Sequence, residues 1–168
     1  MRLLTPLALA VVCATGARAE APEVITDIPV VQSLVATVMG QAGTPMLLLD
    51  QGADAHDFQL RPSQISALNG ADLVVWMGPE MTPWLDRALS LDTLANTLSL
   101  LHTSGTHLRS SAEGRTQPTD ANDTGAGTDD AHHHEGTDPH AWLDPDNAAL
   151  WLSQIADALA QRDPGNAA

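Results

Sequence analysis

The stretch ADLVVWMG, residues 71–78, decides the fold. Its apolar run is uninterrupted, which is typical of a strand buried on both faces in a parallel sheet covered by helices. Outward from it, shorter apolar runs predict further strands at 23–28, 46–50 and 97–101. Amphipathic segments bounded by Pro or Gly predict helices at 29–39, 62–69 and 83–89. This alternation predicts an α/β fold with a four-stranded parallel sheet flanked by helices.

Residues 102–138 have a different composition from the segments around them. They contain seven acids, five His, five Gly and a single large aliphatic residue, Leu108. Such a segment buries too little apolar surface to offset the entropy of ordering, so we expect a long, mobile, disordered loop rich in His and acids. After it, Pro145 predicts the start of a last helix, which runs to Gln161.

The N-terminus predicts export from the cytoplasm. Residues 1–19 combine Arg2, an apolar stretch and a small-x-small cleavage pattern, as in a signal peptide, and no later stretch is long enough to span a bilayer. Cys13, the only cysteine, lies inside this segment, where a lipoprotein would be acylated, although Val12 before it suits that processing poorly. The mature chain would have no thiol, so a metal site must use nitrogen and oxygen.

Charge narrows the range of partners. Removal of Arg2 and Arg18 with the signal changes the formal net charge from −14 to −16. A field of that sign repels nucleic acid and concentrates cations, and it also serves solubility alone.

Two histidines lie in polar turns at the predicted edge of the sheet. His56 lies in GADAHDFQLRPSQ, six residues beyond the second predicted strand, and His140 lies in DPHAWLDP. Ligands of open parallel sheets bind beyond the carboxyl ends of the strands, and imidazole is a common zinc ligand. The pair predicts a zinc site, with Asp54, Asp57 or Asp138 as a carboxylate ligand or an orienting partner. A lone His is otherwise usually a surface or core residue without a ligand.

A second group of histidines lies in the predicted loop. His132, His133 and His134 precede Glu135. On a flexible chain they cannot preorganise a tetrahedral site, but they can chelate transiently and raise the ion concentration near a stronger site. The alternative is an inert compositional tract.

Together these segments resemble the zinc-binding solute receptors of bacterial ABC transporters. The resemblance rests on VITDIPVVQSLVATVMG, GADAHDFQLRPSQISALNGADLVVWMG, the His-rich loop and DPHAWLDPDNA. It implies two α/β lobes with the ion between them, His56 and His140 as the N-lobe metal ligands, and a loop that captures or senses zinc. Ala55 stands where some zinc-type members carry an acid.

The resemblance also implies how the chain is divided. We expect an α/β N-terminal lobe at 20–101, the loop at 102–138 and the end of that lobe with its last helix at 139–168, with the C-terminal lobe absent. Two histidines on one lobe would hold an ion less tightly than a closed site with three or four ligands.

The expected function is therefore binding and not catalysis. A monomeric periplasmic protein would capture Zn²⁺ and deliver it to a membrane ABC permease. The alternatives are a stand-alone zinc buffer that uses the loop, a truncated product without function, and a zinc hydrolase with Asp54 or Asp57 as general base.

Overall fold

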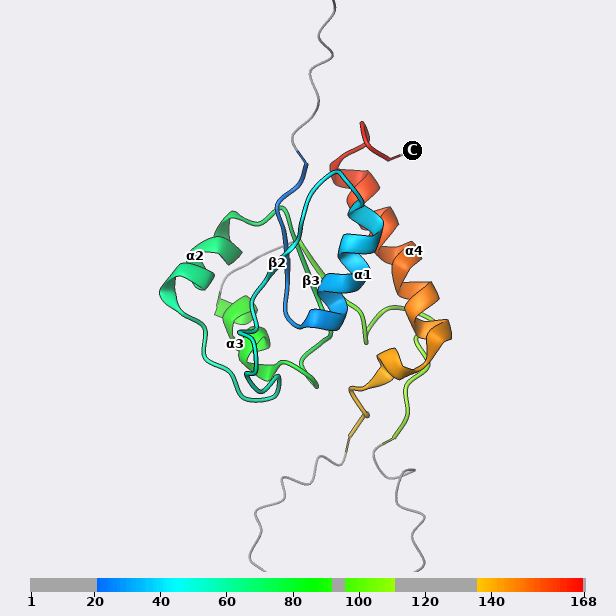
Figure 1. Cartoon of the computed structure of the whole chain (residues 1–168). Coiled ribbons are helices and arrows are strands. Elements are labelled where there is room, and N and C mark those ends of the chain that lie inside the picture. The colour runs from blue at the N-terminus through cyan, green and yellow to red at the C-terminus, as the bar shows by residue number, and fades with distance from the viewer. Residues whose placement is uncertain (1–20, 92–95, 111–135, 168) are drawn as a thin grey trace, which may run out of the picture.

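A computed structural model describes residues 21–91, 96–110 and 136–167 (Figure 1). The predicted signal peptide and the loop histidines His132, His133 and His134 lie outside these residues. In the described part, short strands alternate with helices along the chain. They are β1 (Val24–Thr26), α1 (Pro29–Met39), β2 (Met46–Leu47), α2 (Pro62–Gly70), β3 (Leu73–Trp76), α3 (Pro83–Leu91), β4 (Thr97–Ser99), the 3₁₀ turn η1 (Ala141–Leu143) and α4 (Pro145–Arg162).

The four strands form one parallel sheet in the order β2-β1-β3-β4. The first crossover leads from β1 to one side and the next two lead to the other side, so right-handed connections place α1 on one face and α2 and α3 on the opposite face. Figure 1 shows this arrangement, with α4 packed beside α1. The predicted four-stranded parallel sheet flanked by helices is confirmed.

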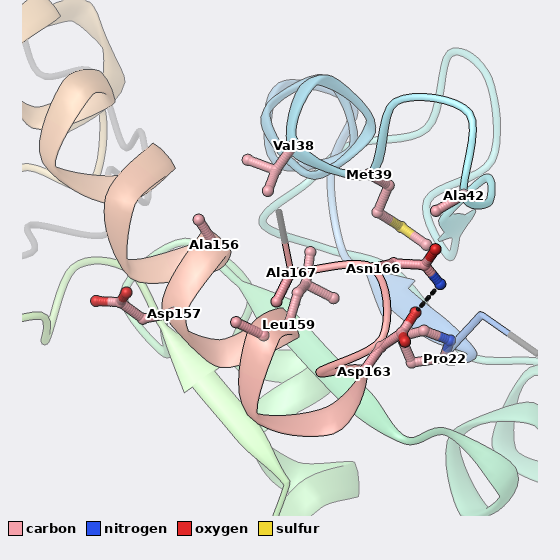
Figure 2. Close-up of a pocket in the computed structure, with 11 residues that line it drawn as sticks. Pro22, Val38, Met39, Ala42, Ala156, Asp157, Leu159, Asp163, Asn166 and Ala167 are labelled. Atoms are coloured by element: carbon pink, nitrogen blue, oxygen red, sulfur yellow. Dashed lines mark hydrogen bonds between the residues drawn. The ribbon is translucent and has the colours of Figure 1, made fainter. Parts of the chain in front are cut away.

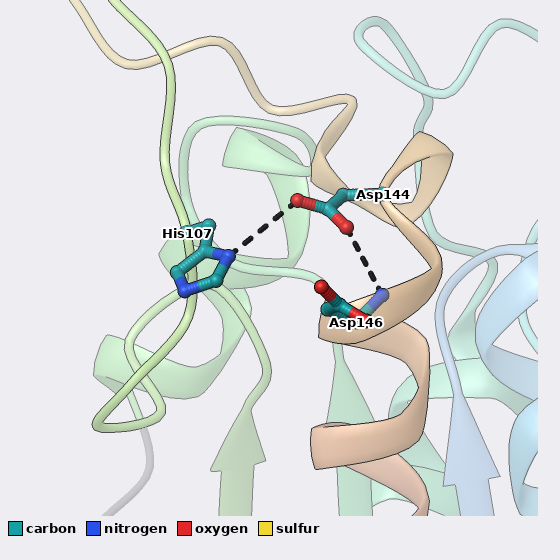
Figure 3. Close-up of side chains that lie close together, drawn as sticks. All are labelled: His107, Asp144 and Asp146. Atoms are coloured by element: carbon teal, nitrogen blue, oxygen red, sulfur yellow. Dashed lines mark hydrogen bonds and ion pairs between the residues drawn. The ribbon is translucent and has the colours of Figure 1, made fainter.

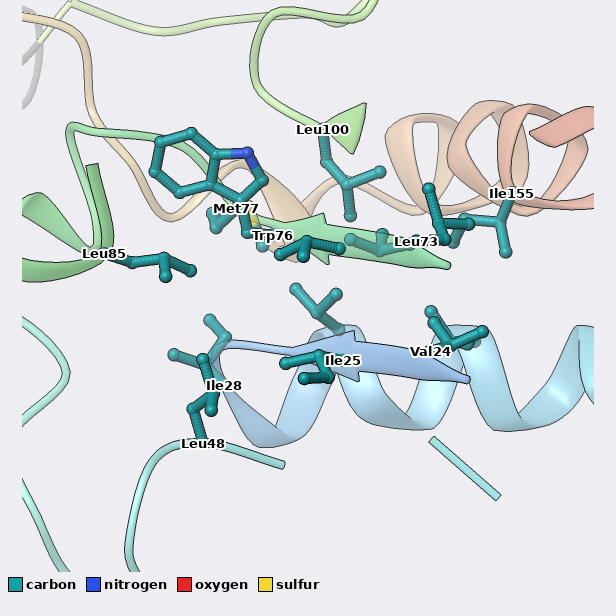
Figure 4. Packing of buried hydrophobic residues seen from close by; sticks show 14 of the residues in the cluster. Val24, Ile25, Ile28, Leu48, Leu73, Trp76, Met77, Leu85, Leu100 and Ile155 are labelled. Atoms are coloured by element: carbon teal, nitrogen blue, oxygen red, sulfur yellow. The ribbon is translucent and has the colours of Figure 1, made fainter. Parts of the chain in front are cut away.

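The core lies on both faces of the sheet (Figure 4). All four residues of β3 are buried, as the apolar run 71–78 predicts. One face of the sheet is covered by Val31 and Val35 of α1 and Trp151 and Ile155 of α4, all of them fully buried. The strands are shorter than predicted, yet the Leu48 N–H still donates to the Thr26 carbonyl (2.9 Å), which continues the pairing beyond β2.

The two ends of segment 102–138 are placed, in contrast to the expectation of a mobile loop throughout. Ser110 and Thr137 form an antiparallel bridge, and the Asp138 N–H donates to the Arg109 carbonyl (2.8 Å). Trp151 of α4 holds the N-terminal end of the segment, because its Nε1–H donates to Thr106 Oγ1 (3.0 Å). These contacts explain the difference: the ends of the segment are held by hydrogen bonds to each other and to α4, and not by apolar residues of their own.

A buried carboxylate lies at the end of the sheet, at the point where the crossovers change direction. Asp27 follows β1 and is fully buried; its Oδ2 accepts from the Met77 N–H (2.8 Å) and the Thr82 hydroxyl (3.0 Å), and its Oδ1 accepts from the Ile28 N–H (2.8 Å). Burial nevertheless raises the pKa of Asp27 to about 6, against the opposing effect of these bonds. The three donors therefore compensate only part of the desolvation.

The raised pKa predicts a pH-dependent stability. A carboxyl group with a raised pKa in the folded state contributes stability fully below its unfolded pKa of 3.8 and loses it as pH rises through about 6. We expect Asp27→Asn to remove this fall between pH 4 and 6, and to lower the free energy of unfolding by about 1–3 kcal/mol at pH 5 because a buried N–H loses its acceptor.

Urea unfolding of both proteins at pH 4.5, 5.5 and 7 measures this. A constant difference between wild type and variant across the three pH values would contradict the assignment.

Candidate metal centre

His56 lies in a tight polar turn between β2 and α2. The Asp54 carboxylate accepts from the backbone N–H of His56 (2.9 Å), and the Ala53 N–H donates to the Asp50 carbonyl (3.0 Å). Asp50 also forms a two-pronged ion pair with Arg61, with both N–O distances at 2.9 Å. The turn is thus closed on itself and leaves the His56 side chain exposed.

Helix α3 fixes this turn from the other side. The Nε1–H of Trp84, a buried residue, donates to the Ala55 carbonyl (2.8 Å), directly before His56. The Phe58 ring meets the Trp84 indole edge to face, with centroids 5.1 Å apart. Since Thr82, two residues before Trp84, donates to Asp27, the position of His56 is connected to the end of β1.

His140 lies at the start of η1, directly before α4. Its Nδ1 lies 2.8 Å from Asp138 Oδ1, which also accepts from the His140 backbone N–H (3.0 Å). Both bonds lower the pKa of Asp138, and the bond from the backbone N–H has the larger effect. A carboxylate on Nδ1 holds the proton there and leaves Nε2 with its lone pair directed away, which is how a metal-binding imidazole is usually oriented.

The two imidazoles come together although 84 positions separate them in the sequence. Their ring centroids are 5.9 Å apart with an interplanar angle of 64°. On its other side His140 meets the Trp142 ring, with centroids 5.1 Å apart. Both side chains are exposed, so an ion can reach the space between them from solvent.

The predicted carboxylates occupy different positions around this pair. Asp138 orients His140, whereas Asp54 is turned toward the backbone of its own loop, and Asp57 is exposed. Among residues 21–91, 96–110 and 136–167, the one group of three or more His, Asp or Glu side chains with ligand atoms within 4.8 Å of one another is His107, Asp144 and Asp146. The two histidines therefore gain no third ligand of this kind in the described part.

Another hollow lies at the opposite end of the sheet and takes no part in this centre. A pocket of about 300 Å³ opens between the C-terminal ends of α1 and α4, beside Pro22 at the start of β1 (Figure 2). Apolar groups such as Val38 and Leu159 line much of it, together with Asp163, whose Oδ2 accepts from Asn166 Nδ2 (2.7 Å). No histidine lines it.

Sequence reasoning missed two residues that hold the centre in place. Trp84 binds the His56 turn, and Asn147, a buried residue of α4, donates from Nδ2 to the Ala141 carbonyl beside His140 (3.0 Å). The signal for Asn147 is a polar residue on the helix face that also carries Trp151, where an apolar residue is expected. Trp84 carries no comparable signal, because its partner is a backbone carbonyl 29 residues away.

The Trp84 bond gives a local prediction. Trp84→Phe removes the donor to the Ala55 carbonyl and is expected to speed hydrogen exchange of the Ala53 and His56 amides about fivefold, as the loss of about 1 kcal/mol implies. The control is Trp76→Phe, because the buried Trp76 Nε1 has no hydrogen-bond partner in the described part of the chain. Equal exchange rates for these two amides in both variants would show that the bond does not hold the turn.

The comparisons with known proteins agree with this architecture. A family model described as zinc-uptake complex component A, periplasmic, matches residues 24–168. The high-affinity zinc uptake system protein ZnuA of Paracoccus denitrificans (strain Pd 1222) is 44% identical over an alignment of 185 positions, gaps included, which covers 98% of this chain and 57% of that protein. ZnuA of Yersinia pestis is 31% identical over an alignment of 169 positions, which covers 95% of this chain and 52% of that protein. The chain spans about half the length of these relatives.

Among solved structures, zinc(II)-bound AdcA from Streptococcus pneumoniae aligns with a TM-score of 0.63 at 22% identity and covers 88% of this chain and 27% of that one. The chain thus shares the α/β fold of part of that structure. The chain belongs to the ZnuA family of periplasmic zinc-uptake components. The family predicted from the sequence motifs is confirmed. None of the helices in the described part has the length and apolar character needed to cross a bilayer.

Proposed function

We propose that this protein is the periplasmic zinc-binding component of an ABC uptake system, which captures Zn²⁺ through His56 and His140 and delivers it to a membrane permease as a monomer. The observation that carries the proposal is the 5.9 Å separation of the two imidazole centroids. Family membership supports the choice of zinc, and the relatives named as zinc-uptake proteins support the transport role.

The ring separation fits a shared ion. An imidazole nitrogen binds zinc at about 2.0–2.1 Å, which places the ion about 3.2 Å from the ring centroid. Two rings on one tetrahedral ion then have centroids about 5.2 Å apart, and about 6.4 Å is the upper limit. The observed 5.9 Å lies between these values, so the rings reach the tetrahedral distance by an approach of less than about 1 Å.

Ligand type favours zinc over manganese. Both proposed donors are nitrogens, and nitrogen-rich sites suit zinc better than manganese, which prefers oxygen. A closed zinc site has three or four protein ligands, so water or groups outside the described residues complete the coordination. The hydrolase alternative has less support, because one Asp54 oxygen is already held by the His56 N–H.

The loop histidines act in this proposal as a weak collector. His134 is six residues from His140 in the sequence, and a chain of that length reaches at most about 20 Å. The bridge between Ser110 and Thr137 lies beside Asp138, the partner of His140. Weak chelation by His132, His133 and His134 would raise the zinc concentration near the main site. A stand-alone buffer would instead keep its zinc on these residues.

The main site gives a direct test. His56→Ala and His140→Ala are each expected to weaken the tightest zinc-binding step roughly 100-fold or more, because each removes one of two protein ligands. Both residues are exposed, so thermal stability without metal should not change. The affinity is measured by competition with a chromophoric chelator in a chain whose loop histidines are replaced by Ala.

His102→Ala is the matched control, since this exposed histidine pairs with Glu80 (2.9 Å) and is not part of the pair. A tight step that survives in both His56→Ala and His140→Ala would refute the proposal. Loss of tight binding on replacing only the loop histidines would favour the buffer.

The orienting role of Asp138 gives a finer prediction. Asp138→Asn keeps an oxygen acceptor but replaces a charged bond to Nδ1 by a neutral one, so we expect zinc affinity to fall roughly tenfold at unchanged thermal stability. Asp157→Asn, which removes the same charge from an exposed site on α4, serves as the control for the overall field. An equal fall in both variants would assign the effect to charge alone.

A further inference from the structure

A second group of possible metal ligands lies beside the proposed zinc site, at the start of α4. His107, Asp144 and Asp146 each offer one ligand atom, and these atoms all lie within 4.8 Å of one another. Figure 3 shows the three side chains turned toward a common space. His107 comes from the ordered end of segment 102–138, whereas the two carboxylates come from the N-terminal cap and first turn of α4.

A buried residue fixes the histidine of this group. The amide of Asn147, which is 1% exposed, bonds both backbone groups of His107: Oδ1 accepts from its N–H (2.7 Å) and Nδ2 donates to its carbonyl (2.9 Å). Burying a primary amide for this purpose is costly unless its bonds are satisfied, and all three of its observed bonds go to backbone near the two candidate sites. The imidazole therefore projects from a rigid point and not from a free loop.

The facing atoms of His107 and Asp144 are spaced like two ligands of one ion and not like a hydrogen-bonded pair. Asp144 Oδ1 accepts from the Asp146 N–H (3.0 Å) and so caps the helix, while Oδ2 points to His107 Nδ1 at 3.6 Å. That distance is long for a hydrogen bond. It is close to the separation of about 3.3 Å between two ligands of one tetrahedral zinc ion. The exposed Asp146 carboxylate has the rotamer freedom to complete the set.

We propose that His107, Asp144 and Asp146 form a second binding site for a divalent cation, and that Zn²⁺, which accepts both imidazole nitrogen and carboxylate oxygen, binds there. A pocket of about 330 Å³ lies beside the group: His107 and Asp144 line it together with Asp138, His140 and the cation Arg109, whereas Asp146 and His56 do not.

This site is the weaker of the two. His107 is 69% exposed, and the positive end of the α4 dipole opposes a cation at the helix start. Two carboxylates offset that effect, and water fills the remaining positions. The inference does not require that His56 bind metal, so the two sites can fail independently.

The test follows Zn²⁺ titration by ¹H–¹⁵N NMR of the full chain with His132, His133 and His134 replaced by Ala, which removes competition from the loop. The signals are the His107 ring and the His107 and Asp146 amides. We expect saturable shifts, and we expect Asp144→Ser and Asp146→Asn each to raise the zinc concentration at half-saturation roughly tenfold. Serine at 144 still accepts from the Asp146 N–H, so the helix keeps its cap.

Two comparisons make the outcome decisive. Asp157→Asn removes one charge from the same helix away from the group, and it should leave the titration unchanged. The titration is repeated with His56→Ala, where shifts at His107 should persist. Absence of shifts at His107, unchanged half-saturation in both cluster variants, or loss of the shifts with His56→Ala would each overturn the inference. The last result would mean that His107 only senses an ion at the first site.

Discussion

The Asp27 carboxylate is the contact on which the rest of the molecule depends. It lies where the chain changes the direction of its crossovers, between β1 and β3, and it joins the ends of these strands through the Met77 N–H. Parallel strands end with unpaired backbone groups at this edge, and the buried carboxylate satisfies two of them, the Ile28 and Met77 N–H groups, at the cost of desolvation. The edge that carries the proposed metal ligands is therefore fixed from inside the sheet.

Two separate series of hydrogen bonds lead outward from the core to the two histidines. One runs from Asp27 through Thr82 and α3 to Trp84, and so to the turn of His56. The other starts at α4, where Asn147 donates to the Ala141 carbonyl beside His140 and Trp151 donates to Thr106 Oγ1. Each imidazole is exposed while the backbone that carries it is held by buried groups. A pair of ligands on loops can be preorganised in this way without a third ligand to draw them together.

Most of the architecture could be predicted from local patterns, because apolar runs such as 71–78 and the Pro or Gly residues at helix ends are local signals. The convergence of His56 and His140 was predicted only as a shared sheet edge, and their ligand role remains a prediction. The ends of segment 102–138 were expected to be mobile, since composition cannot show that Trp151 and Asn147 lie opposite them. The group around His107 was missed for the same reason: its members belong to segments that meet only in the folded chain.

The bridge between Ser110 and Thr137 has a consequence for how this part of the gene can vary. Ser110 and Thr137 are joined by this bridge. The addition or loss of residues between positions 111 and 135 is therefore not expected to distort the Asp138 turn. In general, closing a loop of twice the length costs only about 0.6 kcal/mol more. The number of residues and of histidines between positions 111 and 135 can thus change in evolution, while the Ser110–Thr137 bridge keeps the Asp138–His140 turn in place.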